Sequence, residues 1–170
     1  MNKMLLIVDP QVDFITGTLP VKGAVEAMDA LAEYVKSHGD DYSVKIVTSD
    51  WHPYHHCSFN REGGQWPPHC IQHSVGAAIW QPLLVALNES RGGYTLLYKG
   101  DSIDKEEYSI IDNEKSSAVL LRLIFALQID KIDICGLAGD VCVRNTAKDL
   151  QTILGEGKVN VMEEFSPSIA

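Results

Sequence analysis

The regular alternation of short apolar runs with longer amphipathic segments constrains the fold more than any other feature of this sequence. Five apolar runs end in polar or turn residues, and they lie at residues 4–9, 44–50, 94–100, 131–137 and 159–164. Short apolar runs without strict polar alternation are typical of strands that are buried on both faces of a parallel sheet. We therefore expect five such strands.

The segments between these runs have the spacing of amphipathic helices, with apolar residues at intervals of three and four. The apolar positions are Val25, Met28, Leu31 and Val35; Ile79, Leu83, Leu84 and Leu87; Val119, Leu120, Leu123, Ile124 and Leu127; and, within 141–154, Val143, Ala147, Leu150 and Leu154. Strands that alternate with helices favour right-handed crossovers and a three-layer α/β/α fold. We expect a single domain over residues 1–170, with a doubly wound, Rossmann-like parallel sheet of five or six strands.

The composition argues against several classes of function. Acidic residues outnumber basic ones by 23 to 14, and nucleic-acid binding needs basic patches. The richest apolar stretch, VLLRLIFALQI, contains Arg122 and is shorter than the roughly 18 residues of a membrane span. The N-terminal run is too short for a signal peptide. We expect no nucleic-acid or membrane partner and a cytoplasmic location, where cysteines are more often free, metal-bound or catalytic than paired.

Reactive side chains follow four of the five predicted strands. Asp9 ends the first strand, Asp50 and His52 follow the second, Lys99 ends the third and Cys142 comes just after the fourth. In open parallel sheets the ligand crevice lies beyond the carboxyl ends of the strands, beside the point where the winding reverses. We expect these side chains to share one rim and to form one site.

Cys142 lies in GLAGDVCV, which predicts a strand, a turn of small residues and the first turn of a helix. Backbone N–H groups and the helix dipole would stabilise a thiolate there and lower its pKa. The same N–H groups could receive the oxyanion that forms when the thiolate attacks a carbonyl. The alternative is a buried structural cysteine, a role that Cys135, inside an apolar strand, fits better.

Asp9 and Lys99 also have two interpretations each. Next to a thiol, Asp9 could take its proton and later transfer it to a leaving amine. By itself it would cap the turn PQVDFITG, which also contains Asp13. Lys99 close to an acid and a thiol would hold both in the ionised form, whereas alone it is an ordinary solvated lysine at a strand end.

The loop from Trp51 to about Gly76 concentrates potential metal ligands. With the residue before it, the loop offers Asp50, His52, His55, His56, Cys57, Glu62, His69 and Cys70. A structural zinc site could use the two cysteines, but they lack the paired spacing of zinc fingers. A catalytic or substrate-binding site would use Asp50 and His52, which point to the same side of an extended chain, and His69. A histidine-rich loop without metal is the third interpretation.

Five motifs occur in order along the chain: DPQVDF (9–14), SDWHPYHHCSF (49–59), WPPHC (66–70), YKG (98–100) and GLAGDVCV (136–143). Together they resemble the nicotinamidase (pyrazinamidase) family of the isochorismatase-like cysteine hydrolases. The resemblance implies a catalytic triad of Asp9, Lys99 and Cys142. It implies metal ligands at Asp50, His52 and His69, with a further ligand from Glu62 or His56. It also implies a cis peptide at Leu137–Ala138, oxyanion-hole N–H groups from Ala138 and Cys142, and contacts of Phe14 and Trp66 with the pyridine ring.

The implied activity is hydrolysis of nicotinamide to nicotinate and ammonia through a thioester on Cys142. A divalent metal, with zinc favoured over manganese or iron, would orient the pyridine ring. The alternatives are a related amidohydrolase for carbamoyl or maleamate-type substrates, and a non-catalytic metal-binding scaffold of the same fold. The chain ends at SPSIA, where similar proteins continue with a helix and a sixth strand. We therefore expect a domain that is short at its C-terminus, and a bare sheet edge that a second copy would cover in a homo-oligomer.

Overall fold

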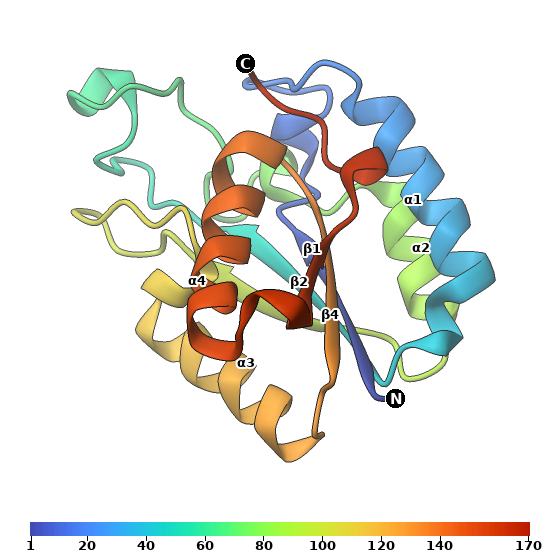
Figure 1. The fold of residues 1–170 in the computed structure, drawn as a ribbon. Helices are drawn as coiled ribbons and strands as arrows, with labels where there is room; N and C mark the ends of the chain where they lie inside the picture. The colour runs from blue at the N-terminus through green and yellow to red at the C-terminus, as the bar shows by residue number, and fades with distance from the viewer.

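A five-stranded parallel sheet forms the middle layer of the computed structural model, which describes residues 1–170 (Figure 1). The strands are β1 (Lys3–Val8), β2 (Val44–Asp50), β3 (Thr95–Lys99), β4 (Lys131–Gly136) and β5 (Val159–Val161). Their order is β3-β2-β1-β4-β5, and every pairing is parallel. The predicted doubly wound sheet is confirmed, with five strands.

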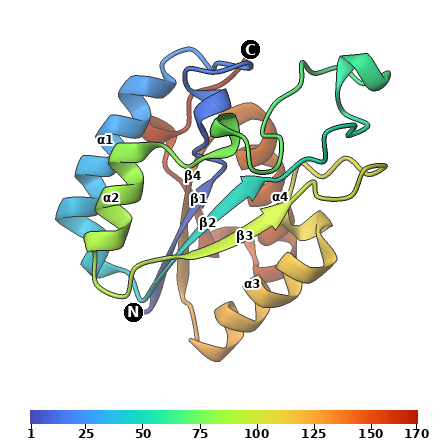
Figure 2. The ribbon, with the colours of Figure 1, turned by 180° about the vertical axis from the view of Figure 1, so that it is seen from behind.

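Two pairs of helices cover the two faces of the sheet (Figures 1 and 2). The helices are α1 (Ala24–His38), α2 (Gln81–Glu89), α3 (Glu114–Ala126) and α4 (Arg144–Leu154). Successive side chains of a strand point to opposite faces, so Leu5 and Ile7 of β1 pack with α1 and α2, while Leu6 packs with α3 and α4. Both faces are therefore apolar, which explains the continuous apolar runs. None of the helices has the length and apolar character that crossing a membrane requires.

Some boundaries differ from those that the apolar pattern predicts. β5 has only three residues, and the chain turns away from the sheet after it. The fourth helix begins at Arg144, because a π-helical turn, Gly139–Val143, comes first and contains Cys142. α3 begins several residues before its apolar positions, where the Asn113 side chain accepts a hydrogen bond from the Ser116 N–H.

The winding of the sheet reverses between β1 and β4, and the backbones of these two strands approach closely at their carboxyl ends. Val8 is in register with Gly136, and the Leu137 N–H donates to the Val8 carbonyl at 2.8 Å. Gly136 has a φ of 126°, and a Cβ atom there would lie 2.1 Å from the Val8 carbonyl oxygen. Only glycine fits this position. The close approach brings Asp9 beside the turn that carries Cys142.

We expect Gly136→Ala to lower the free energy of unfolding by about 3 kcal/mol or more, because the methyl group meets backbone and the φ is unfavourable for alanine. Urea unfolding would measure the change. Gly157→Ala is the matched control, since a Cβ at Gly157 has no atom within 4 Å. Equal losses of stability in the two variants would contradict this account of the strand ends.

Candidate active site

Lys99 lies at the centre of a cluster that joins four strand ends. Its Nζ is 2.8 Å from Asp9 Oδ2 and 2.6 Å from Asp50 Oδ1, and it donates to Cys142 Sγ at 3.4 Å. All four side chains are buried. Lys99 is therefore not a solvated strand-end lysine. The structure brings together the acid, ammonium and thiol that the sequence places at separate strand ends.

The two carboxylates beside Lys99 have different environments. Burial raises the pKa of Asp9, and the charge of Lys99 only partly offsets this effect. Burial would also raise the pKa of Asp50, but Lys99 and His52 lower it below its ordinary value. Asp9 Oδ1 accepts a hydrogen bond from the Thr48 hydroxyl at 2.7 Å, while Oδ2 is ion-paired with Lys99 Nζ at 2.8 Å. Asp9 is therefore the more basic of the two carboxylates.

Burial would lower the pKa of the Lys99 ammonium, yet the charges of Asp50 and Asp9 raise it well above its ordinary value. The lysine is therefore a permanent cation within the site.

The environment of Cys142 corrects one expectation. The sequence predicts a lowered thiol pKa at the start of a helix, but burial raises the pKa of Cys142 well above its ordinary value, although Lys99 lowers it in part. The Cys142 sulfur and the nearest carboxylate oxygens of Asp9 and Asp50 all lie within 4.8 Å of one another. The resting nucleophile is thus a thiol beside a basic carboxylate, and it requires a base to remove its proton.

The turn before Cys142 has the backbone that the resemblance implies. The peptide bond between Leu137 and Ala138 is cis. The Ala138 N–H donates to no backbone or side-chain acceptor, whereas the carbonyl of Ala138 accepts from Val141 and Val143. One free N–H therefore lies near the thiol.

Three residues next to the cluster have the arrangement of a metal site. Asp50 Oδ2 is 3.5 Å from His52 Nε2 and 3.8 Å from His69 Nε2. Nδ1 of His52 is 2.8 Å from the Gly100 carbonyl, and Nδ1 of His69 is 2.7 Å from the Pro67 carbonyl. Since a carbonyl only accepts, each Nδ1 carries the proton and each Nε2 has a free lone pair. His52 Nε2 is buried without a hydrogen-bond partner, as expected of a ligand atom.

Burial and the Asp50 carboxylate affect these histidines differently. Burial lowers the pKa of His69, and Asp50 does not fully compensate. Burial would also lower the pKa of His52, but its closer contact with Asp50 raises it. Two imidazole nitrogens and one carboxylate, with ligand atoms within 4.8 Å of one another, fit a divalent ion such as zinc.

The structure does not bring Glu62 or His56 into this group. The turn Asn60–Glu62 stands away from the sheet in Figure 1, and Glu62 Oε1 is 2.7 Å from His55 Nδ1. His56 is buried, but Nδ1 accepts from the Ser58 N–H and Nε2 is 2.9 Å from the Lys105 carbonyl. Both nitrogens of His56 are therefore engaged.

His56 instead supports a ligand, because its ring stacks on His52 with the centroids 4.0 Å apart. The two cysteines of this loop also lie outside the group. Cys70 is in the apolar core beneath α1, and Cys57 is half-buried, with burial raising its pKa. The structure thus favours a site of Asp50 with two histidines over a cysteine-rich structural zinc site.

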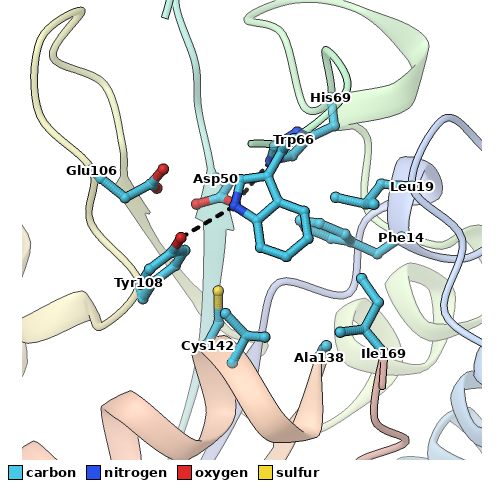
Figure 3. Close-up of a pocket in the computed structure, with 11 residues that line it drawn as sticks. Phe14, Leu19, Asp50, Trp66, His69, Glu106, Tyr108, Ala138, Cys142 and Ile169 are labelled. Atoms are coloured by element: carbon cyan, nitrogen blue, oxygen red, sulfur yellow. Dashed lines mark hydrogen bonds and ion pairs between the residues drawn. The ribbon is translucent and has the colours of Figure 1, made fainter. Parts of the chain in front are cut away.

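A pocket opens above Cys142 and contains about 370 Å³ of space, part of it open to solvent (Figure 3). Its lining residues are Phe14, Leu19, Asp50, Trp66, His69, Glu106, Tyr108, Ala138, Val141, Cys142 and Ile169. Phe14 and Trp66, which the resemblance places at the substrate ring, both face it. Trp66 Nε1 donates to the Tyr108 hydroxyl at 3.2 Å. A mostly apolar pocket with a thiol and a carboxylate at one end suits a small flat ring that carries one polar group.

Two polar residues of the motif DPQVDF have roles that the sequence analysis does not assign. Gln11 holds the end of β2, because its amide donates to the Asp50 carbonyl at 2.8 Å and accepts from the Asp50 N–H at 2.9 Å. Asp13 accepts from the Cys70 N–H at 2.8 Å and so fixes the chain next to His69. The period-two spacing of Asp9, Gln11 and Asp13 after an apolar strand is the signal that could have identified them.

The segment before α3 supplies residues that no sequence pattern indicates. Glu107 is buried and accepts from the Gly100 N–H at 2.8 Å, and its carbonyl accepts from Lys99 Nζ at 3.3 Å. Glu106 and Tyr108 line the pocket. Burial and the nearby Asp50 carboxylate raise the pKa of Glu106.

Known proteins are similar to this chain along most of its length. Residues 3–152 match the family model described as the isochorismatase domain. The chain is 32% identical to the nicotinamidase/pyrazinamidase of Mycobacterium tuberculosis, over 86% of this chain and 77% of that protein. It is 31% identical to the nicotinamidase of Escherichia coli, over 95% of this chain and 81% of that protein.

Two solved structures are similar along almost the whole chain. The pyrazinamidase of Pyrococcus horikoshii in complex with zinc has a TM-score of 0.83 and 29% identity, and covers 100% of this chain and 88% of its own. PnC1 from L. infantum in complex with nicotinate has a TM-score of 0.84 and 30% identity, over 99% of this chain and 82% of its own.

We expect Lys99→Met to lower the free energy of unfolding by about 3 kcal/mol or more, because it leaves Asp9 and Asp50 buried without a counter-charge. The pKa of both carboxyls would then exceed that of the unfolded chain. A folded state that binds more protons than the unfolded one becomes more stable as pH falls. The variant should therefore gain stability from pH 8 to pH 5, measured by urea unfolding with a chelator present.

The control is Lys45→Met, which removes another buried lysine, whose Nζ donates to the carbonyls of Gly39 and Arg91. It should lose stability without this gain at low pH. If Lys99→Met showed the pH profile of Lys45→Met, the account of paired charges would be wrong.

Proposed function

The chain belongs to the nicotinamidase/pyrazinamidase family of isochorismatase-like hydrolases, and on that premise we propose that it hydrolyses nicotinamide to nicotinate and ammonia. The observation that carries the proposal is the buried contact of Lys99 with Asp9 and with the Cys142 sulfur, at the base of an apolar pocket. This arrangement combines a nucleophile, a base and a fixed cation within reach of one bound carboxamide.

Asp9 would begin the reaction by taking the thiol proton of Cys142. The raised pKa of Asp9 favours this transfer, since a general base works best when its pKa approaches the working pH. The sulfur then attacks the carboxamide carbon. The oxyanion would be received by the N–H groups of Ala138 and Cys142, and the unpaired N–H of Ala138 supports this assignment.

Collapse of this adduct would leave a thioester on Cys142. Asp9 returns its proton to the leaving nitrogen, and ammonia departs. A water molecule, deprotonated by Asp9, then hydrolyses the thioester to nicotinate. Lys99 remains charged throughout and stabilises the negative charge of both sulfur and carboxylate.

Asp50, His52 and His69 would hold a divalent metal, with zinc favoured, and the unpaired lone pair of His52 supports this assignment. The bound ion would supply a Lewis acid with an open position for the ring nitrogen. Phe14 and Trp66 would contact the ring itself.

The metal group favours nicotinamide over carbamoyl or maleamate-type amides, which have no ring nitrogen to bind. The intact contact of Lys99 with Asp9 and Cys142 likewise favours an enzyme over a non-catalytic scaffold. We further propose a cytoplasmic location and a homo-oligomer.

Cys142→Ala should abolish ammonia release from nicotinamide, with kcat lower by a factor on the order of a thousand or more. Cys57→Ala is the control, because that half-buried cysteine lies outside the cluster and should leave kcat unchanged. Substantial activity in Cys142→Ala would exclude the proposed nucleophile. Wild-type protein that hydrolyses carbamoyl amides but not nicotinamide would favour the alternative substrate class.

His69→Ala should lose the metal, because only two of the three ligands remain. Elemental analysis of dialysed protein would measure this, with about one ion per chain expected in the wild type. His55→Ala is the matched control, since His55 is exposed and paired with Glu62. Chelator should remove the ion and the activity of the wild type together. Equal metal content in the two variants would contradict the assigned ligands.

A further inference from the structure

The chain after β5 lies against the turn that carries the nucleophile. The Gly139 N–H donates to the Pro167 carbonyl at 2.9 Å, and a Cβ at Gly139 would lie 2.1 Å from the Ser166 carbonyl oxygen. Asp140 accepts from the Ile169 N–H at 2.9 Å and from the next N–H at 3.1 Å. The two segments are therefore in close backbone contact along the edge of the pocket.

This contact places Ile169 in the pocket wall. Figure 3 shows its side chain beside Ala138 and below Phe14, on the side away from Glu106 and Tyr108. It is half-buried and packs against the core beneath α1. No other part of this terminal segment lines the pocket.

The two sides of the pocket differ in chemistry. The side with Asp50, Glu106 and Tyr108 is polar and can recognise a substrate by hydrogen bonds or through a metal. On the opposite side, the side chains of Ile169 and Leu19 offer only hydrocarbon. An apolar wall discriminates by size, and one extra methyl group in such a wall changes kcat/KM by about tenfold or more.

We propose that Ile169 is a specificity-determining residue, which limits the size of the heteroaromatic ring that can enter while its carboxamide reaches Cys142. This inference rests on the proposed function, and it adds the residue that limits which amides the enzyme accepts. Asp140 is a positioning residue in this arrangement, because its carboxylate accepts from two backbone N–H groups and fixes the segment beside the nucleophile turn.

The test compares nicotinamide with nicotinamides that carry a methyl group on ring carbon 4, 5 or 6. The measured quantity is kcat/KM for each methylated amide divided by that for nicotinamide, which does not depend on the fraction of active protein. Ile169→Ala should raise this ratio about tenfold for at least one methylated amide, and Ile169→Phe should lower it. For nicotinamide itself, Ile169→Ala should raise KM several-fold with kcat little changed, because it removes uniform binding.

Ile153→Ala is the matched control, since Ile153 lies on α4, is 44% exposed and does not line the pocket. Its ratios should equal those of the wild type. If Ile169→Ala does not fold, Ile169→Val should shift the same ratio in the same direction by a smaller factor. Asp140→Asn should also raise the ratio for the methylated amides, because the segment that carries Ile169 is then held less firmly.

If the wild type hydrolyses nicotinamide but the Ile169 variants have the same ratios as the wild type, this inference is overturned and the proposed function stays intact. A wild type that hydrolyses none of these amides would overturn the proposed function, and with it the substrate class assigned to this wall.

Discussion

The buried ammonium of Lys99 between two carboxylates is the interaction on which this site depends. Removing three charged groups from water costs several kcal/mol for each ion, and only close pairing offsets it. The sheet provides that pairing, because β1, β2 and β3 are adjacent and parallel and end at the same edge. Burial raises the pKa of Asp9 more than Lys99 lowers it, whereas Asp50 has His52 and His69 beside it as well as Lys99, and its pKa is lowered. The imbalance leaves a carboxylate with an affinity for the thiol proton.

A layer of hydrogen bonds holds the loops that carry the ligands. Gly100 has a φ of 67°, and a Cβ there would lie 2.5 Å from His52 Cε1. The N–H of Gly100 donates to Glu107, while its carbonyl faces His52 Nδ1. Gln11 holds the end of β2, and Asp13 holds the loop that returns to the site. These contacts with the backbone therefore orient the metal-binding side chains of Asp50, His52 and His69. They leave the atoms that would bind the metal free.

The switch between β1 and β4 explains why the nucleophile and its base meet. Their close approach at Gly136 allows the cis peptide and the π-helical turn to lie directly beside Asp9. The segment after β5 packs on the same turn and brings Ile169 to the pocket. Cys142 and Ile169 are thus both positioned by the turn after β4, although they are far apart in the sequence.

The sequence predicts a doubly wound parallel sheet, the five apolar strands and the strand ends that carry Asp9, Asp50, Lys99 and Cys142, but not the order of the strands. These features follow from local periodicity, because a strand buried on both faces must be apolar until it ends. The raised pKa of the Cys142 thiol could not be predicted from local pattern, because it depends on burial by residues that are distant in the sequence.

The motifs also indicate Asp50, His52 and His69 as metal ligands, but they leave open whether Glu62 or His56 joins them, and that depends on how the loop folds. His56 and Glu62 are as close in sequence as the ligands, but His56 Nε2 contacts the Lys105 carbonyl and Glu62 pairs with His55. Tyr108 and Ile169 reach the pocket from segments without periodic pattern. Their positions arise from packing and from backbone contacts between distant segments, and neither leaves a signal in a single sequence.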